Sequence, residues 1–273
     1  MSDGVIYVAT GRDYLELARA SAASLRAHNP GLPVELFTDV PEATGLEIFD
    51  AVRPVPRVHD RAKLDCLPLT RFRRTLYLDC DTLVLRGFGD LFDILDRFDC
   101  AFAHDMRRAS PLIREGRDER TPYAFPQVNS GVVLYRRTAA MWGLLGEWAA
   151  RFHDAADVSR DQVILKDLLW SGDIRFYVLP PEFNLRRVTM LDAWEPLDAL
   201  PTILHSHRLL DHLRCNGAPR LTTLEDVLAA ERLAHAAEWR GGRPAGWPAS
   251  APKGLEECRA EGQAASASAS TSR

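Results

Sequence analysis

The sequence predicts an α/β protein with a mostly parallel central sheet flanked by helices, and three observations support this prediction. Short apolar segments of strand length alternate along the chain with longer segments that have helical periodicity. Hydrophobic residues make up 46% of the 273 residues, which is enough to bury the core of one large domain. Two aspartates directly follow a strand-like segment, and open α/β sheets bind their ligands at this end of the strands.

The first hundred residues show the β-α order most clearly. Residues 5–9 predict a short buried strand, and apolar side chains at helical spacing predict a helix from Tyr14 to Ala27. The next segments are predicted as a strand, an extended piece, a helix and two further strands, at residues 33–39, 51–58, 63–72, 75–78 and 100–103.

The second half of the chain continues the alternation. The expected elements are a strand, two helices and two strands, at residues 128–135, 139–152, 161–170, 174–179 and 202–205. We expect Trp142, Leu145 and Trp148 to lie in the core, because they recur at helical spacing. Thr223 is expected to cap a helix that runs to about Trp239.

Two segments lack any periodic pattern. Residues 106–127 are rich in arginine, acids and proline and predict a long loop near the site. This loop is either a solvated connector or an acceptor-recognition loop. The second is favoured, because ordered domains seldom keep loops of about 20 residues without a function. Residues 241–273 are rich in glycine, proline, alanine and serine, and this composition predicts a flexible tail.

Composition excludes several classes of partner. The net charge of −4 gives no overall attraction to nucleic acid or to an anionic membrane. The five cysteines are odd in number and lack C-x-x-C pairing, which favours a reducing cytoplasm. No run reaches the roughly 18 to 20 apolar residues of a spanning helix, so we expect no transmembrane segment and at most peripheral attachment at the inner face of a membrane.

The aspartate pair lies within the apolar segment 76–85, as Asp79-Cys80-Asp81. In an extended chain, alternate side chains share a side, so the two carboxylates would face the same way and repel each other. A divalent cation relieves that repulsion, and oxygen ligands suit Mg²⁺ or Mn²⁺ bound to phosphates. The alternative is a strand that ends at Asp79 and is followed by solvated turn aspartates.

Four further segments, in their order and rough spacing around this pair, resemble the glycogenin-like, retaining family of glycosyltransferases. They are residues 5–14, 63–70, 128–135 and 161–165. The resemblance extends from residue 5 to about residue 210. It implies the GT-A type nucleotide-diphospho-sugar transferase fold, a UDP-sugar as donor substrate, and Mn²⁺ or Mg²⁺ as the metal.

The resemblance also implies a set of metal ligands. Asp79 and Asp81 would supply two of them, and the family's histidine after a late strand corresponds to His205. His207 is the alternative third ligand.

At the next positions the chain departs from the family. The glycine and the lysine-proline-tryptophan that usually follow the histidine are absent, so the phosphate-binding lysine is missing. Arg208 or Arg214 could replace it, because a guanidinium pairs well with diphosphate oxygens. By resemblance Lys63 faces the donor phosphate or the transferred sugar, and the alternative for Lys63 is an exposed helix lysine.

Two groups of polar residues are expected around the sugar. Asp105, Asn129 and Ser130 can hydrogen-bond sugar hydroxyls. Asp161 and Gln162 lie where the family keeps the group beneath the anomeric carbon, and the choice between nucleophile and electrostatic stabiliser stays open.

The nucleotide base has its own expected turn. Ala9, Thr10 and Gly11 form a tight turn after the first strand, and Tyr14 offers a ring for uracil to stack on. Tyr14 could instead lie in the helix core, and Thr10 or Asp13 could act as helix caps.

The resulting hypothesis is a metal-dependent transferase that moves a hexosyl unit from a UDP-sugar with retention of configuration. Residues 1–221 would form the catalytic domain, residues 222–240 a C-terminal helix packed on it, and residues 241–273 the tail. One alternative is a sugar-nucleotidyltransferase, although the turn at residues 9–12 is poor in glycine for that class. The other is a catalytically inactive nucleotide-sugar-binding protein, which the missing lysine element would allow. The sequence identifies neither the sugar nor the acceptor.

Overall fold

The computed structural model of this protein describes residues 2–108, 110, 116–215 and 217–240. It divides into two compact units. The first comprises residues 1–186 and 200–207, and the second comprises residues 187–199 and 208–273. The predicted tail at residues 241–273 lies outside the described residues.

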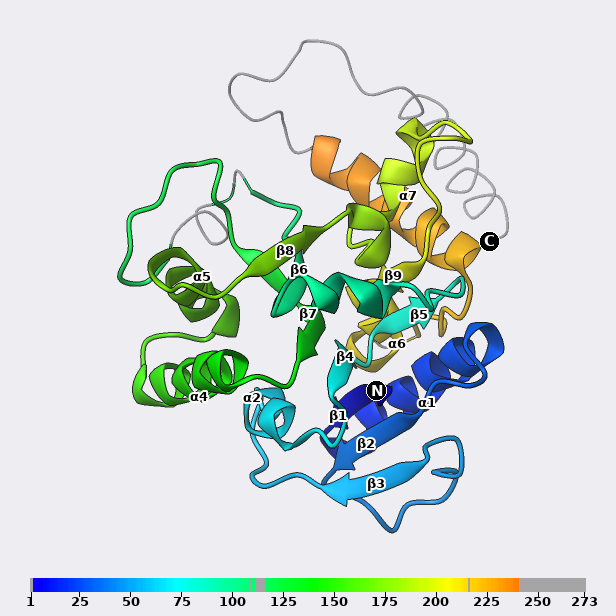
Figure 1. Ribbon diagram of the computed structural model, residues 1–273. Coiled ribbons are helices and arrows are strands. Elements are labelled where there is room, and N and C mark those ends of the chain that lie inside the picture. The colour runs from blue at the N-terminus through cyan, green and yellow to red at the C-terminus, as the bar shows by residue number, and fades with distance from the viewer. Residues whose placement is uncertain (1, 109, 111–115, 216, 241–273) are drawn as a thin grey trace, which may run out of the picture. The chain divides into compact units, whose positions relative to one another are not determined.

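A seven-stranded sheet organises the first unit, with the strand order β3-β2-β1-β4-β7-β6-β8 (Figure 1). The strands are β1 Asp3–Ala9, β2 Val34–Thr38, β3 Ala51–Pro54, β4 Arg74–Leu78, β6 Cys100–His104, β7 Val128–Arg136 and β8 Phe176–Leu179. Every pair is parallel except the two pairs that involve β7, which runs antiparallel to β4 and β6. The predicted α/β architecture with a mostly parallel sheet is therefore confirmed.

A second, two-stranded sheet forms directly after the aspartate pair. It joins β5 (Thr82–Val84) to β9 (Ile203–His205) in antiparallel register, and Thr82 lies opposite His205. The apolar segment around the pair is thus two strands in different sheets, with a turn at residues 79–81 between them. The prediction that one extended strand aligns both carboxylates is wrong, because the chain turns there to leave one sheet and enter the other.

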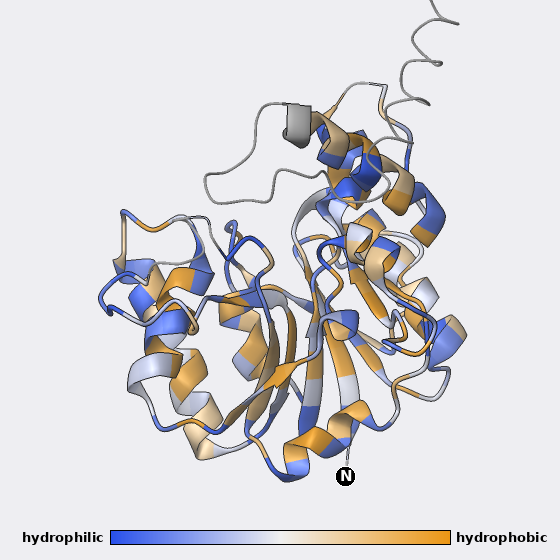
Figure 2. Cartoon of the chain, turned by 90° about the horizontal axis from the view of Figure 1, so that it is seen from above, coloured by the Kyte–Doolittle hydropathy of each residue, from blue (hydrophilic) through white to orange (hydrophobic). Residues whose placement is uncertain are grey.

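Helices cover both faces of the large sheet (Figure 1). On one face, α1 (Gly11–His28) packs against β1, and the Tyr7 hydroxyl is hydrogen-bonded to Ser21 of this helix over 2.9 Å. On the other face lie α4 (Ala139–Asp154) and α5 (Asp161–Ser171). Figure 2 shows apolar residues along the strands between these helix layers, as a sheet buried on both faces requires.

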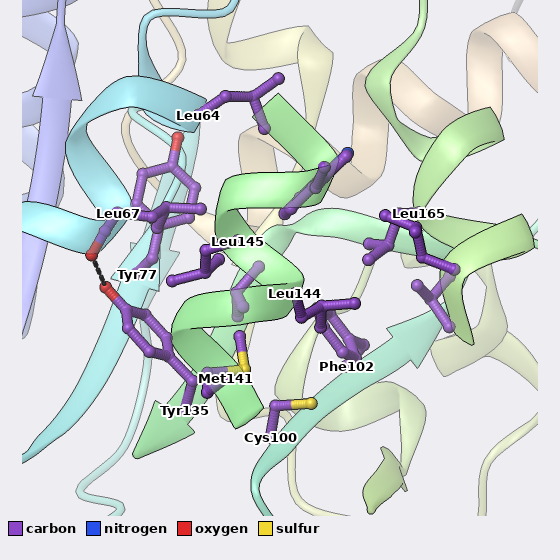
Figure 3. Close-up of a cluster of buried hydrophobic side chains, with 14 of the residues drawn as sticks. Leu64, Leu67, Tyr77, Cys100, Phe102, Tyr135, Met141, Leu144, Leu145 and Leu165 are labelled. Atoms are coloured by element: carbon purple, nitrogen blue, oxygen red, sulfur yellow. Dashed lines mark hydrogen bonds between the residues drawn. The ribbon is translucent and has the colours of Figure 1, made fainter. Parts of the chain in front are cut away.

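An apolar cluster lies between the sheet and α4 (Figure 3). Trp148 is completely buried, Leu145 is buried, and Trp142 packs against the cluster, so the predicted core role of these side chains is confirmed. The Tyr135 hydroxyl donates a 2.7 Å hydrogen bond from β7 to the Leu67 carbonyl. This bond ties the chain segment that carries Lys63 to the sheet.

That segment is shorter than predicted. The helix expected over residues 63–72 consists of α2 (Lys63–Cys66) followed by a 3₁₀ turn, Leu67–Leu69. Pro68 explains the change, because its nitrogen cannot donate the hydrogen bond that would continue the α-helix. The other 3₁₀ turns are Leu91–Asp96, Pro181–Phe183, Val188–Ala193 and His207–Leu210.

The second unit contains α6 (Asp211–Arg214) and α7 (Leu224–Arg240). Thr223 precedes α7 and its hydroxyl oxygen accepts a 3.1 Å hydrogen bond from the Asp226 backbone, which confirms the predicted cap. Among the helices of the described residues, none combines the length and apolar character needed to cross a bilayer.

Candidate functional site

The carboxyl ends of β1, β4 and β6 lie at one edge of the large sheet, and β7 begins at the same edge because it runs the other way. Turn residues that follow the parallel strands and the first residues of β7 therefore meet there. This is the edge at which open α/β sheets bind ligands.

Asp79, Asp81 and His205 converge at this edge. Each offers one ligand atom, and these atoms lie within 4.8 Å of one another. Nε2 of His205 is 3.3 Å from Oδ1 of Asp81 and 3.7 Å from Oδ2 of Asp79. The turn at residues 79–81 and the register of β5 with β9 position all three groups.

The Asp79 carboxylate has distinct partners on its two oxygens. Oδ1 accepts a short hydrogen bond from the Tyr77 hydroxyl and lies 3.5 Å from Nζ of Lys63. Burial and the charge of Asp79 raise the pKa of Tyr77, so its hydroxyl remains a donor. Oδ2 is left facing His205, in the direction that a shared cation would occupy.

Asp81 is held as a carboxylate. Burial raises its pKa, but the charge of His205, its hydrogen bond and the charge of Arg186 together bring that pKa well below the usual range. Asp81 is therefore ionised at neutral pH without a bound metal.

Lys63 is the buried cation of the site. Its Nζ donates to the carbonyl and to Oγ of Ser130, both over 2.9 Å, and lies 3.7 Å from Oδ2 of Asp161. The Ser130 hydroxyl donates to that same Asp161 oxygen over 2.7 Å, and Nε of Arg61 lies 3.1 Å from the other. Lys63 is thus a buried side chain within a charged network, not an exposed helix lysine.

Asp161 keeps its charge in this network. Burial raises its pKa, but Lys63, Arg61 and the Ser130 hydrogen bond lower the pKa below the ordinary value. One carboxylate oxygen contacts Ser130 and Lys63, and the other lies beside Arg61. Asp161 therefore holds the Lys63 and Arg61 side chains in place.

Asp105 anchors a neighbouring group of polar side chains. Its Oδ2 accepts hydrogen bonds from the Gln162 amide over 3.0 Å and the Asn129 amide over 3.4 Å. Arg160 lies 3.6 Å from the same oxygen. Burial raises the pKa of Asp105, while the Gln162 hydrogen bond, the Arg186 charge and the other partners lower it on balance.

His205 is held from behind by a residue that the sequence did not single out. Its Nδ1 lies 2.9 Å from Oδ1 of Asn184, which follows the 3₁₀ turn at residues 181–183. Asn184 is 1% exposed and His205 is 3% exposed, so the ring has little freedom to turn.

Gly131 of β7 leaves the space that His205 occupies. A Cβ atom at position 131 would fall 2.0 Å from Cε1 of His205 and 2.7 Å from Oδ2 of Asp79. The absence of a side chain at this position allows the ring and the carboxylate to approach the strand.

Arg186 is a second site residue that no local sequence pattern indicates. Leu185 pairs with β9 through two backbone hydrogen bonds, Leu185 N to Ile203 O over 2.8 Å and His205 N to Leu185 O over 3.2 Å. Arg186 therefore lies beside His205. Among the described residues, no carboxylate forms an ion pair with its guanidinium.

The turn expected to hold the base lies after β1. Gly11 has a positive φ of 80°, and its backbone N–H donates to Oδ1 of Asp39 over 2.8 Å. Thr10 occupies the N-cap position of α1 without a side-chain capping bond. Tyr14 is 43% exposed rather than part of the helix core.

Cys80 links this turn to the aspartate pair. Its thiol contacts the Val8 carbonyl over 3.2 Å, one residue before Ala9, and its side chain is buried. The turn at residues 9–11 and the carboxylates of Asp79 and Asp81 therefore lie along the same edge of the sheet.

The two arginines proposed to replace the family lysine lie in the second unit. Arg208 is paired with Glu231 over 3.1 Å and with Asp211 over 3.4 Å. Arg214 closes α6. His207 begins the 3₁₀ turn that leaves the first unit.

The described part of the loop over residues 106–127 contacts α5 at Asp167 and at Trp170, whose ring meets that of Phe125 edge-on. The backbone N–H groups of Arg117 and Asp118 both donate to Oδ2 of the buried Asp167, each over 2.8 Å. Residues 109 and 111–115 of this loop lie outside the described part of the chain.

A second histidine cluster has a different character. The Nε2 atoms of His59 and His153 each lie 2.9 Å from the Asp65 carboxylate. Arg57 already places a guanidinium nitrogen 2.8 Å from Nε2 of His153, and the Arg61 backbone N–H donates to Nδ1 of His59. Because Nδ1 of His59 accepts a hydrogen bond, its Nε2 carries the proton and donates to Asp65. The cluster is therefore a set of hydrogen bonds around Asp65 and the Arg57 guanidinium.

The trio at residues 79, 81 and 205 does fit a divalent ion. It supplies two ionised carboxylates and an imidazole nitrogen that faces them, a donor set that suits Mn²⁺ and Mg²⁺ bound to phosphates.

Comparison with known proteins bears on the fold. No protein-family model matches the chain, and no curated protein sequence matches it. The glycosyltransferase GlyE of Streptococcus pneumoniae TIGR4 superimposes with a TM-score of 0.56 and 20% identity, over 75% of this chain and 55% of GlyE. This chain therefore spans about half the length of GlyE.

A second solved structure is the galactosyltransferase LgtC in complex with donor and acceptor sugar analogues. It has a TM-score of 0.51 and 17% identity, and the match covers 88% of this chain and 99% of LgtC. These likenesses confirm the predicted GT-A fold. The narrower resemblance to the glycogenin-like family stays a prediction.

Proposed function

We propose that this protein is a metal-dependent glycosyltransferase that moves a hexosyl unit from a UDP-sugar with retention of anomeric configuration. The observation that carries the proposal is the convergence of Asp79, Asp81 and His205 beside the buried Lys63, at the ligand-binding edge of a GT-A fold. The solved glycosyltransferases of this fold support the same class of reaction.

The metal site would consist of Asp79, Asp81 and His205, holding Mn²⁺ or Mg²⁺. Such an ion, when bound, neutralises the negative charge that develops on a departing diphosphate. Tyr77 and Lys63 contact Oδ1 of Asp79, so Oδ2 stays oriented toward His205. The ligand atoms are therefore in place before an ion binds.

Lys63, Ser130 and Asp161 would form a fixed network of charges and hydrogen bonds next to the bound sugar. Lys63 is held by Ser130 and by two carboxylates, so its charge stays fixed while the glycosidic bond breaks. A fixed charge in a buried site stabilises a developing charge without reorganisation. With both oxygens engaged, Asp161 fits electrostatic stabilisation of a positive sugar carbon better than direct attack.

Other residues would bind the remaining parts of the donor. Asp105 and Asn129 would hydrogen-bond sugar hydroxyls, and Gln162 would position them through its own bonds to both. The turn at residues 9–11 would hold the nucleoside, with the exposed Tyr14 ring stacking on uracil.

A panel of nucleotide sugars tests the proposal. We expect Mn²⁺-dependent release of UDP from at least one UDP-hexose, with saturation-transfer NMR showing contact to the uracil and the sugar. Donor binding without UDP release would indicate a nucleotide-sugar-binding protein. Release of pyrophosphate from a nucleoside triphosphate and a sugar phosphate would indicate a nucleotidyltransferase.

The donor diphosphate needs a protein cation in addition to the metal. We expect Arg186 to supply it, because its charge acts on both Asp81 and Asp105. Arg186→Ala should weaken UDP-sugar binding by about 10- to 100-fold, because a charge-assisted contact contributes ~1.5–3 kcal/mol. The same variant should bind Mn²⁺ alone as tightly as wild type or more tightly, because a positive charge close enough to lower the pKa of Asp81 also repels a cation bound there.

Isothermal titration with Mn²⁺ alone and then with the UDP-sugar separates these two effects. Arg208→Ala is the matched comparison, since Arg208 already has Glu231 and Asp211 as partners. If Arg208→Ala lowers UDP-sugar affinity more than Arg186→Ala does, Arg208 and not Arg186 binds the diphosphate.

A further inference from the structure

Three buried amide side chains connect Asp105 to the candidate metal ligand His205. We call Gln162, Asn129 and Asn184 the amide chain. Their side chains are linked by hydrogen bonds of 3.0 to 3.2 Å, and the last of them contacts Nδ1 of His205. All three are at most 8% exposed. Each amide bonds the next through one oxygen and one nitrogen, so the direction of each bond constrains the next.

The direction of the first two amides is fixed by groups that have only one hydrogen-bonding role. The Ser130 backbone N–H can only donate, and it points at the Gln162 oxygen over 3.4 Å. The Gly131 backbone N–H likewise donates to the Asn129 oxygen over 3.0 Å. The ionised Asp105 can only accept, and it takes the amide nitrogens of both residues.

The third amide follows from the second. Since the Asn129 oxygen faces Asn184, that residue has to present its nitrogen, and the bond measures 3.0 Å. Its own oxygen then faces His205 at 2.9 Å and can only accept. Nδ1 of His205 must therefore carry a proton, which leaves Nε2 with a lone pair when the ring is neutral.

The opposite tautomer would otherwise have an advantage. Nε2 lies 3.3 Å from the Asp81 carboxylate and 3.7 Å from that of Asp79, and both would favour a proton on Nε2. A proton on Nε2 blocks metal coordination, because a ligating imidazole nitrogen has to be unprotonated.

We propose that Asn184 is a positioning residue that fixes His205 as the Nδ1–H tautomer, with its direction set by Asp105 through the amide chain. The inference rests on the metal site of the proposed function. It also couples the two ends of the site, because the expected sugar-hydroxyl ligand Asp105 orients the amides that orient the metal ligand.

Asn184→Leu tests the proposal through the tautomer itself. In wild-type protein with ¹⁵N-labelled histidine, long-range ¹H–¹⁵N NMR at a pH where the ring is neutral should show His205 protonated on Nδ1. Asn184→Leu should move that proton to Nε2. Its affinity for Mn²⁺ without nucleotide, measured by electron paramagnetic resonance, should fall by about 10- to 100-fold, the usual effect of removing a partner behind a ligand.

Two further variants separate positioning from a general structural effect. Asn184→Asp keeps an acceptor for Nδ1–H, so it should keep the wild-type tautomer even if the protein loses stability. Asn29→Leu removes an asparagine that accepts the Phe88 backbone N–H elsewhere in the first unit, and should leave both His205 and Mn²⁺ affinity unchanged.

The outcomes distinguish this inference from the proposed function. If wild-type His205 carries its neutral-state proton on Nε2, or if Asn184→Leu changes neither tautomer nor Mn²⁺ affinity, Asn184 has no positioning role. If wild-type protein binds no Mn²⁺, the metal site of the proposed function fails, while the tautomer measurement still decides the direction of the amide chain.

Discussion

Asp81→Asn is expected to lose metal-dependent UDP release, on the order of 10²-fold or more, while the protein keeps its fold. Asp81 is partly buried in the turn between β4 and β5, and its pKa is held low, so it offers a full negative charge to a cation. An asparagine keeps the shape but removes that charge, which weakens both the ion and the diphosphate bound to it.

The measurement is UDP release at saturating Mn²⁺, together with Mn²⁺ affinity and the far-ultraviolet circular dichroism spectrum. Asp173→Asn changes an exposed aspartate in the same way and should behave as wild type. Wild-type Mn²⁺-dependent turnover in Asp81→Asn would remove the central assignment, whereas loss of the folded spectrum would call for Asp81→Glu as a gentler change.

Some parts of this site could be predicted from the sequence because each leaves a local signal. A pair of carboxylates inside an apolar segment needs an explanation wherever it occurs, and Asp79 and Asp81 were recognised on that ground. The alternation of strands and helices similarly predicted the α/β architecture. His205 is predicted from the order of the family's segments. The register of β5 with β9 places it next to Asp79 and Asp81.

The remaining parts depend on contacts between distant segments. Asn184 follows a proline-containing 3₁₀ turn and has no surrounding motif, so nothing local indicates that it faces His205. Arg186 lies near Asp81 only because Leu185 pairs with β9. Strand periodicity does not predict the turn at residues 79–81, because it carries no information about a change of sheet.

Gly131→Ala is expected to lower Mn²⁺ affinity and UDP release on the order of 100-fold, through two of the proposed ligands at once. The new Cβ would lie 2.0 Å from Cε1 of His205 and 2.7 Å from Oδ2 of Asp79, closer than these atoms can approach. The His205 ring cannot retreat without breaking its 2.9 Å contact with Asn184. Overpacking of this kind also costs about 1–3 kcal/mol of unfolding free energy.

A second glycine provides the control. A Cβ at Gly143, inside α4, meets no atom within 4 Å, so Gly143→Ala should raise the unfolding free energy by about 0.5–1 kcal/mol and leave Mn²⁺ affinity unchanged.

A double-variant cycle identifies the group that is overcrowded. If the His205 ring is the main obstacle, Gly131→Ala should cost clearly less unfolding free energy in a His205→Ala background than in wild type, because the ring that it meets is gone. Equal costs in the two backgrounds would show that the strain arises in β7 itself. Wild-type Mn²⁺ affinity in the single Gly131→Ala variant would show that the close approach of His205 and Asp79 to this strand is not needed for metal binding.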